Sequence, residues 1–239
     1  SCNISDSGTG GYNANIACLI NSAIVAKWYT IEFEQMFVRG KYHNKKQNLG
    51  TLPSRTTTLV DGTTIRCLFS PQDKVSENAI RPLIQSAKSK IDVAVFFLTH
   101  KTISGDLIKA HQRGVKVRAI IDASGAKNGY TKFEFLREAG IPVKIENWGG
   151  KMHMKAAVID DQSLILGSMN WTAAGDRSND ENTLIINNRT HAATFSNFFE
   201  KLWTGIPDKW SAGRPDPESR DSGTSWKDGI DNDFDGLID

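Results

Sequence analysis

The residues best suited to chemistry lie in the segment 153–160, HMKAAVID, which has the pattern H-x-K-x4-D. Side chains two residues apart in an extended segment share a face, so His153 and Lys155 are expected to point into one pocket. An imidazole beside an ammonium group suits an anionic substrate. The imidazole supplies a titratable nucleophile or proton donor, and the ammonium group supplies a fixed positive charge for phosphate oxygens.

Further polar residues follow at spacings that place them near the same pocket. Ser168 and Asn170, in the sequence GSMN, alternate onto one face at the end of a second expected strand and would add neutral hydrogen-bond donors. Glu181 follows the next loop, and its carboxylate is suited to hold the His153 ring in one tautomer. Asp160 belongs either to the site or to a turn, and in both interpretations its carboxylate is expected to accept turn backbone N–H groups.

A lone H-x-K pattern is weak evidence for catalysis. A second one occurs at His43 and Lys45, in a polar stretch with Gly50 at the Asp position, and that pair is predicted to be solvated on the surface. The remaining histidines are predicted to have surface or capping roles, at a strand end or on polar helix positions: His100, His111 and His191. The joint pattern of H-x-K, x4-D and G-S-x-N is what distinguishes His153.

The elements that must position these residues follow from the alternation of apolar patterns. From about residue 63, runs of strand length alternate with segments of helical period, which is typical of βαβ units in an α/β fold with a largely parallel sheet. Strands are predicted at 64–69, 91–98, 115–121, 143–145, 156–159, 163–166 and 183–186. Helices are predicted at 76–90, with Ser76 as N-cap, and at 104–113, 130–139 and 191–203. The dipeptide Asp160-Asp161 is predicted to form a tight hairpin turn.

Three motifs together, HMKAAVID, GSMN and NDEN at residues 179–182, resemble the signature of the phospholipase D superfamily. The resemblance covers residues 63–205 by fold order, and residues 1–37 as the end of a first copy. It implies an α/β sandwich with a mixed, mostly parallel sheet and helices on both faces. It also implies a metal-independent phosphodiesterase that needs no cofactor for catalysis. Its active site would join two H-x-K motifs, from two halves of one chain or from a dimer.

The resemblance implies a role for each site residue. His153 would be the nucleophile, forming a phosphohistidine intermediate, or the acid, and Asp160 completes its motif. Glu181 would be the partner of a catalytic histidine. The residues implied to bind the substrate phosphate are Lys155, Ser168 and Asn170 in this half, and Ser1 and Asn3 in the first half.

An internal repeat pairs the two ends of the chain. Residues 1–5 match 168–172, residues 13–15 fall on 180–182, and residues 32–37 fall on 198–203 one residue out of step. Ala14 then stands where Glu181 does, and the His and Lys of the first copy would precede Ser1.

The repeat predicts that the chain is a fragment in four parts. Residues 1–37 are the end of a first phospholipase D-like half, and 38–62 are a polar linker. Residues 63–205 form a complete second domain, and 206–239 form a polar tail. The missing first half of the same protein, or a second copy, would complete the active site.

Composition limits the substrate only weakly. The chain has 239 residues, 39% of them hydrophobic, and a net charge of +2 from 29 Lys and Arg against 27 Asp and Glu. This balance gives no strong attraction to a polyanion, and the few basic residues near the motif are offset by acidic ones. Hydrolysis of phospholipid head-group phosphodiester bonds is therefore the favoured function. An endonuclease of the same superfamily, cleaving DNA or RNA, is the alternative.

The C-terminal residues resemble the first nine places of a calcium loop. Carboxylates at places 1, 3, 5 and 9 surround a glycine at place 6, and the candidate ligands are Asp231, Asp233, Asp235 and Asp239. Similar repeats in secreted bacterial proteins suggest an extracellular or periplasmic setting. An inactive, calcium-binding anchoring remnant is thus a third candidate function, and a solvated acidic tail is the alternative interpretation of this segment.

Overall fold

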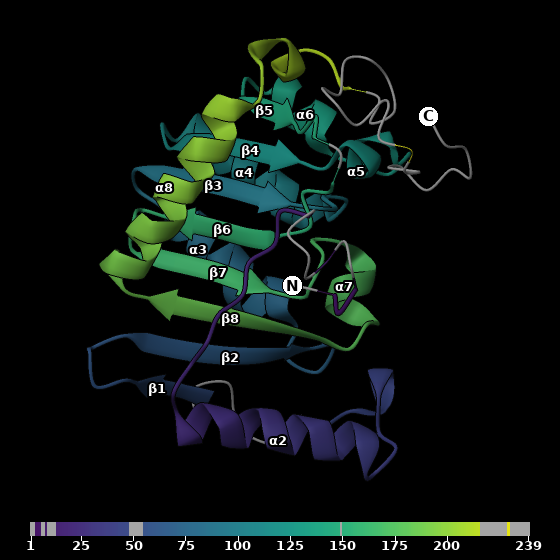
Figure 1. Cartoon of the computed structure of the whole chain (residues 1–239), viewed down its shortest axis with the longest axis vertical. Helices are drawn as coiled ribbons and strands as arrows, with labels where there is room; N and C mark the ends of the chain where they lie inside the picture. The colour runs from purple at the N-terminus through teal and green to yellow at the C-terminus, as the bar shows by residue number, and fades with distance from the viewer. Residues whose placement is uncertain are drawn as a thin grey trace.

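A mixed sheet of eight strands lies at the centre of the computed structural model, which describes residues 3–5, 8, 13–47, 55–148, 150–215 and 229. The strand order is β1-β2-β8-β7-β6-β3-β4-β5, with α2 beside the β1–β2 edge (Figure 1). The strands are β1 (Thr56–Thr58), β2 (Thr64–Ser70), β3 (Lys90–Val95), β4 (Lys116–Ile121), β5 (Val143–Ile145), β6 (Lys155–Ile159), β7 (Ser163–Gly167) and β8 (Glu181–Asn187).

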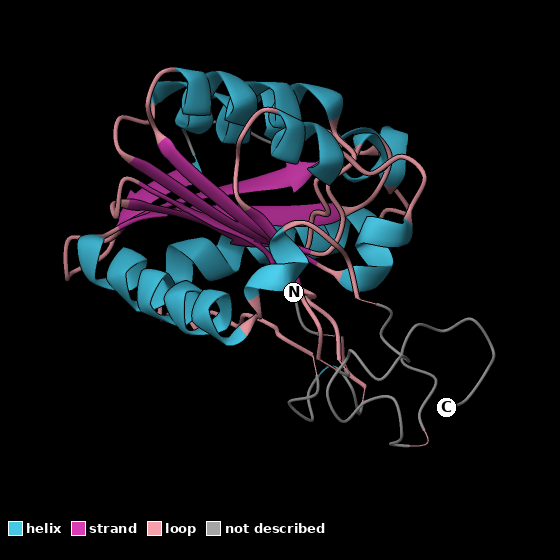
Figure 2. Ribbon diagram, turned by 90° about the horizontal axis from the view of Figure 1, so that it is seen from above, coloured by secondary structure: helices cyan, strands magenta, loops and turns pink. Residues whose placement is uncertain are grey.

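Helices cover both faces of this sheet, as predicted (Figure 2). On one face α8 packs against β3, β6, β7 and β8, and on the other α4 packs against β4 and α3. The helices are α2 (Ala23–Phe37), α3 (Arg81–Ser86), α4 (Lys101–Gln112), α5 (Ala123–Lys127), α6 (Phe133–Glu138), α7 (Ala173–Arg177) and α8 (Arg189–Gly205). Short helical turns occur at His43–Lys45, Ser76–Ile80 and Asp208–Ser211. None of the described helices is long and apolar enough to cross a membrane.

The α/β class and the mixed sheet are confirmed, but most of the sheet is not parallel. Parallel pairing joins β3 to β4 and β4 to β5, whereas the other five neighbouring pairs are antiparallel. The physical reason is the connections. Helical crossovers lie between β3, β4 and β5, but only three residues, 160–162, connect β6 to β7 and therefore force these strands to run in opposite directions.

The turn between β6 and β7 is the predicted hairpin. Asp160 and Asp161 have φ values of 54° and 49°, the left-handed conformation that a type I′ turn requires at both central places, and the Gln162 N–H closes the turn by donating to the Ile159 carbonyl. Every residue of β6 and β7 is buried. A strand buried on both faces reads as a continuous apolar run, which is why these two strands are clear in the sequence.

The helix predicted at 76–90 is shorter and begins differently. The segment opens with a π-helical turn, regular helix starts only at Arg81, and α3 ends at Ser86. Pro82 lies in the first turn of α3, where its missing N–H is tolerated. The prediction of Ser76 as N-cap is wrong, because its side chain lies inside the helical segment and makes no capping hydrogen bond there.

Two segments outside 63–205 pack on this sheet. In the range predicted as a linker, β1 pairs antiparallel with β2. In the range predicted as the end of a first half, α2 also packs on β2. Beyond residue 205, Ile206 and Trp210 are buried in the core. The outer face of α2 stays open to solvent, since Ile24 and Phe37 are 53% and 77% exposed.

Candidate active site

His153 and Lys155 lie together at the start of β6, as their spacing predicts. The ring centroid of Phe96, just after β3, is 5.1 Å from the His153 ring centroid and 5.1 Å from Lys155 Nζ. Lys155 Nζ also donates a 2.6 Å hydrogen bond to the backbone carbonyl of His153. Strand pairing fixes this arrangement, because Lys155 lies opposite Val95 and the Phe96 N–H donates to the Met154 carbonyl.

The Lys155 ammonium group is held in a buried position, with the residue only 3% exposed. Burial lowers the pKa of Lys155 from 10.5 to about 8, against the opposing effect of the Asp122 and Glu181 carboxylates. At neutral pH the group therefore still carries a positive charge in a site of low dielectric, where that charge interacts strongly with an anion.

The GSMN and NDEN motifs form one hydrogen-bonded unit. The Ser168 hydroxyl donates to Glu181 Oε2 at 2.5 Å and accepts from the backbone and side-chain N–H groups of Asn182 at 3.0 and 3.2 Å. Glu181 also accepts from Asn179 Nδ2 at 3.3 Å. Gly167 permits this close approach, because a Cβ there would lie 2.1 Å from the Asn182 carbonyl oxygen.

These hydrogen bonds place Glu181 beside Ser168 and Asn179, although the sequence analysis assigns it to a histidine ring. Its negative charge acts on Lys155, so the two motifs share one electrostatic environment. Asn170 follows at the end of GSMN with a half-buried side chain. Its Oδ1 is buried and accepts no hydrogen bond from the described part of the chain. The amide thus keeps hydrogen-bonding capacity that these residues do not use.

Asp160 lies at the opposite end of β6 from Lys155, so the structure does not place it beside His153 and Lys155. Its carboxylate accepts hydrogen bonds from the backbone N–H groups of Lys88, Ser89 and Lys90 at 2.7 to 3.2 Å. Partial burial raises the pKa of Asp160, but these hydrogen bonds outweigh it and leave the pKa below 3.8. The final residue of the motif thus anchors the turn before β3 instead of its own hairpin turn.

Two buried carboxylates that the sequence analysis does not assign to the site lie beside it. Asp122 follows β4 and Glu146 follows β5, and because these strands are parallel neighbours their carboxyl ends meet. Burial raises the pKa of Glu146, and the charge of Asp122 raises it further. Burial also raises the pKa of Asp122, so the two neighbouring carboxyl groups disfavour each other's charged form.

Asp122 connects this acid pair to the motif. Its Oδ1 accepts from the Gly125 N–H at 2.9 Å, as the N-cap of α5, and its Oδ2 accepts from the Met152 N–H at 3.0 Å. Met152 directly precedes His153, so Asp122 positions the backbone that carries the imidazole. An acidic residue directly after each of two adjacent buried strands is the sequence signal that predicts such a pair.

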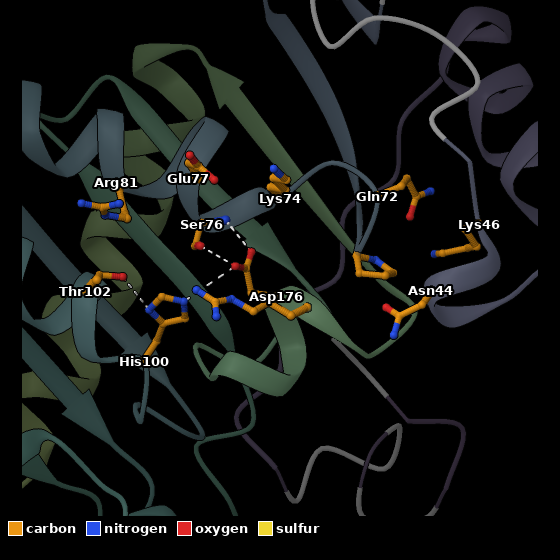
Figure 3. Close-up of a pocket in the computed structure, with 12 residues that line it drawn as sticks. Asn44, Lys46, Gln72, Lys74, Ser76, Glu77, Arg81, His100, Thr102 and Asp176 are labelled. Carbon is orange, nitrogen blue, oxygen red and sulfur yellow. Dashed lines mark hydrogen bonds and ion pairs between the residues drawn. The ribbon is translucent and has the colours of Figure 1, made fainter.

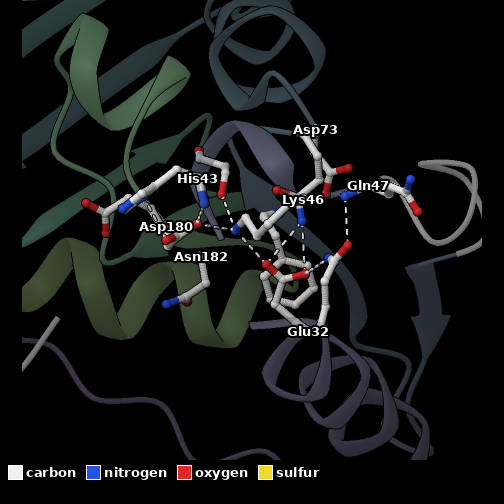
Figure 4. Close-up of polar contacts among 12 residues, drawn as sticks. Glu32, His43, Lys46, Gln47, Asp73, Asp180 and Asn182 are labelled. Carbon is white, nitrogen blue, oxygen red and sulfur yellow. Dashed lines mark hydrogen bonds and ion pairs between the residues drawn. The ribbon is translucent and has the colours of Figure 1, made fainter. Parts of the chain in front are cut away.

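A polar network attaches α2 to the other side of the site (Figure 4). Lys46 Nζ is buried and lies 2.6 Å from Glu32 Oε1 on α2 and 3.0 Å from Asp180 Oδ1 in the NDEN motif. Tyr29 on α2 donates a 3.1 Å hydrogen bond to Asn182 Oδ1. The N-terminal helix thus touches a residue that in turn holds Ser168.

The second H-x-K pattern, at residues 43–45, belongs to this network and not to the group around His153 and Lys155. The side chain of His43 is 62% exposed, as predicted for a surface pair. Its Nδ1 nevertheless lies 2.9 Å from Asp180 Oδ2, so it is paired and not merely solvated.

A separate cavity of about 520 Å³ lies beside α7, which follows GSMN (Figure 3). Asp176 on α7 accepts from the backbone N–H and hydroxyl of Ser76 at 2.8 and 2.6 Å, and lies 3.7 Å from His100 Nε2. His100 caps α4 by accepting from the Ile103 N–H, which confirms the predicted capping role. These contacts join α7, α4 and the π-helical turn and hold the loop after GSMN in place.

The other predicted site residues are not part of this group. Asn3 is described and exposed, whereas Ser1 and the candidate calcium ligands Asp231, Asp233, Asp235 and Asp239 lie outside the described residues. Within the described residues no group of three or more His, Cys, Asp or Glu side chains is arranged to hold a metal ion.

Comparison with known proteins decides the family. Residues 80–203, more than half of the chain, match the family described as cardiolipin synthase, PLD-like domain. The chain belongs to the phospholipase D superfamily. It is 36% identical over 118 residues to a mitochondrial cardiolipin hydrolase of Chlamydomonas reinhardtii, covering 49% of this chain and 53% of that protein. It is 38% identical over 112 residues to a phospholipase D of Rickettsia felis, covering 47% of this chain and 56% of that protein.

Solved structures agree with this assignment of a phospholipase D fold. Nuc from Salmonella typhimurium, described as a phospholipase D family member, is 26% identical with a TM-score of 0.56, covering 61% of this chain and 97% of Nuc. NucT from Helicobacter pylori has the same fold, with a TM-score of 0.57 at 22% identity over 60% of this chain and 98% of NucT. The curated relatives are longer than their match, and this chain spans between about half and two thirds of their length.

The predicted extracellular or periplasmic setting is contradicted by these relatives. Several of them, including those of Chlamydomonas reinhardtii, Mus musculus and Homo sapiens, are named mitochondrial cardiolipin hydrolases. The expectation rested on an acidic tail that resembles repeats in secreted proteins, and charge composition alone does not specify a compartment.

Proposed function

We propose that this chain hydrolyses phosphodiester bonds in phospholipids and that His153 and Lys155 form one half of the catalytic centre. One observation carries the proposal. A buried ammonium group with a lowered pKa and an imidazole both lie 5.1 Å from the centroid of the Phe96 ring, and the charge of Glu181, which accepts from Ser168, acts on the ammonium group. A phosphodiester carries one negative charge at its reacting centre, which this arrangement is suited to bind.

The reaction proceeds by nucleophilic catalysis. The His153 imidazole attacks phosphorus and forms a phosphohistidine, while a second imidazole protonates the leaving alcohol. The second imidazole, now neutral, takes a proton from water, and this water attacks phosphorus and releases the phosphate monoester from His153. Lys155 and Asn170 bind the phosphate oxygens that gain charge in the transition state, with the Ser168 hydroxyl beside them. The second imidazole comes from the first half of the same protein or from a second copy of the chain.

Phospholipid is favoured over nucleic acid for two reasons. The relatives reported above are named cardiolipin hydrolase or phospholipase D. In addition, nucleic-acid enzymes gain affinity from several cationic contacts along a groove, whereas this chain has a net charge of only +2. Cleavage of DNA or RNA is the outcome that would replace this substrate assignment.

The test is hydrolysis by the full chain at moderate salt, assayed on cardiolipin vesicles, phosphatidylcholine vesicles and single-stranded DNA. Lipid turnover that persists in EDTA is expected, because the proposed chemistry uses no metal. DNA cleavage with a steep salt dependence and no lipid turnover would overturn the substrate assignment.

A pair of matched variants assigns the activity to the motif. His153→Asn should abolish turnover, with an unchanged melting temperature as evidence of folding. His43→Asn alters the second H-x-K pattern and should leave turnover near normal. His43 has a φ of 54°, a conformation that asparagine tolerates. Near-normal turnover in His153→Asn would contradict the proposal.

A further inference from the structure

An apolar groove leads away from the phosphate-binding end of the site. One cavity of about 520 Å³ has Ser168 and Asn182 at one end, and a second of about 580 Å³ continues from it toward α8. The two cavities are neighbours, because five residues line both of them: Ile16, Ala17, Cys18, Ile20 and Leu166. Each has the size of an ordinary small-molecule site.

The groove is formed by the sheet and by the segment before α2. This segment, residues 15–21, has no helix or strand, and Figure 1 shows it crossing in front of β6, β7 and β8 on its way to α2. The sheet contributes aliphatic side chains on its α8 face, among them Leu164, Leu166 and Ile186. The sheet thus forms one wall of the groove and residues 15–21 form another.

Polarity changes along the groove in one direction. The end at Ser168 offers a hydroxyl and an amide, and the remainder is mainly apolar. Among the described residues that line the two cavities there is no Lys or Arg. Asp61 and His191, whose Oδ2 and Nε2 atoms are 3.9 Å apart, lie in the cavity farther from Ser168. A polyanion would meet no cation here, whereas a molecule with a phosphate at one end and a hydrocarbon chain at the other matches both ends.

We propose that this groove binds an acyl chain of the phospholipid whose phosphate lies at Ser168 and Lys155. The inference rests on the proposed function, because it names the site that would give this enzyme its preference for lipid over a small soluble phosphodiester. Its occupant is one hydrocarbon chain, entering beside Ser168 and lying between residues 16–20 and the sheet. The N-terminal segment then has a role in substrate binding in addition to its contact with the core.

The experiment measures binding of alkyl phosphates to the full chain by calorimetry, below their micelle concentrations. Methyl, hexyl and dodecyl phosphate share one head group and differ only in chain length. Each methylene buried from water strengthens binding about fourfold. Dodecyl phosphate should therefore bind at least about a hundredfold more tightly than methyl phosphate. Equal affinities for the three would overturn the proposal.

A pair of variants tests where the hydrocarbon chain binds. Ala17 is exposed and lines both cavities, so Ala17→Trp fills the groove, whereas Ala17→Ser keeps it open as a size-matched control. Ala17→Trp should weaken dodecyl phosphate binding about tenfold or more and leave methyl phosphate unchanged, and Ala17→Ser should change neither. If Ala17→Trp leaves dodecyl phosphate binding intact but dissociates a dimer, the groove is a contact between copies and the proposal fails.

The binding experiment separates this inference from the proposed hydrolysis. Chain-length-dependent binding that Ala17→Trp removes, in a protein that hydrolyses no vesicle lipid, would support the groove and contradict the proposed function. Vesicle hydrolysis that is insensitive to Ala17→Trp would support the function and contradict the groove. If Ala17→Trp does not fold, the alkyl phosphate series on the unaltered protein still tests the groove, and vesicle hydrolysis by the unaltered protein still tests the proposed function.

Discussion

The charged residues at the two ends of β6 have opposite environments. At one end Lys155 is almost fully buried, and burial lowers its pKa to about 8. At the other end Asp160 is half-buried and accepts three backbone N–H groups, which hold its pKa below 3.8. A single five-residue strand thus has one end where charge is destabilised and one end where charge is saturated with hydrogen bonds.

The contrast shows which part of the H-x-K-x4-D pattern is chemical and which is structural. A buried charge that is not fully compensated interacts strongly with an incoming anion, and it lowers the free energy of unfolding when no anion is bound. A carboxylate that already accepts several backbone hydrogen bonds has little hydrogen-bonding capacity left for a ligand, but it holds the backbone that donates to it in place. The predictions below test this difference, from the largest expected effect on hydrolysis to the smallest.

Lys155→Met should lower phospholipid hydrolysis by about a hundredfold to a thousandfold, because the charge that stabilises the transition state is lost. The same variant should be more stable at pH 7. A lysine whose pKa falls from 10.5 to about 8 on folding destabilises the fold at pH values below 8 by about 3 kcal/mol. That cost is relieved as pH rises from 8 to 10.5. Chemical denaturation at pH 7 measures it, and a less stable variant would contradict the assignment.

The pH dependence of hydrolysis should show a limb from Lys155. Because the ammonium form is the active one, kcat/KM should fall about tenfold per pH unit above a pKa near 8. Lys155→Arg removes this titration, since guanidinium stays protonated, and the activity that it retains should lack the limb near pH 8 and keep only the limb of the imidazole that protonates the leaving alcohol. A limb that persists unchanged in Lys155→Arg belongs to another group.

Asp122→Asn should lower hydrolysis about tenfold to a hundredfold through misplacement of His153. Its two oxygens accept from the Gly125 and Met152 N–H groups, and an amide offers only one oxygen for the two donors. The matched control is Glu146→Gln, which keeps the acceptor for the Ala123 N–H and a donor toward Asp122. Equal losses in both variants would show that the acid pair acts by its charge and not by positioning.

Glu146→Gln should also change the pH dependence of stability. Folding raises the pKa of Glu146, so its contribution to stability is complete below its unfolded pKa and is lost as pH rises through its folded pKa. The glutamine variant lacks that loss. Its free energy of unfolding should therefore fall less than that of the unaltered chain as pH rises, which urea unfolding across a pH series measures.

Asp160→Ala should have the smallest effect on hydrolysis and a clear effect on stability. Three backbone N–H groups lose their acceptor, so the free energy of unfolding should drop by about 2 kcal/mol. Activity measured well below the melting temperature should stay within about twofold of normal. A loss of activity as large as that of Lys155→Met would remove the distinction between the two ends of the strand.

Much of the fold is predictable because its signals are local. The continuous apolar runs of β6 and β7 and the Asp160-Asp161 turn specify a buried hairpin from the sequence alone. The direction of most strand pairs is not local, because it depends on which strands become neighbours in space. The expectation of a largely parallel sheet fails for that reason.

The candidate site divides in the same way. The grouping of His153 with Lys155 follows from alternation along one segment, and in the structure both side chains lie against the Phe96 ring. The Asp122–Glu146 pair depends on two strands lying side by side, and the hydrogen bonds of Asp160 come from a turn about seventy residues earlier, so motif spacing does not reveal them.

The most direct test of the account is to identify the atom that carries phosphorus during turnover. The full chain is mixed with phospholipid labelled with ³²P in the phosphate, quenched in alkali and digested. The account predicts an alkali-stable, acid-labile label on the peptide that contains His153, absent from His153→Asn and present in His43→Asn. Steady lipid turnover with the label on Ser168, or with no labelled peptide at any time, would contradict it.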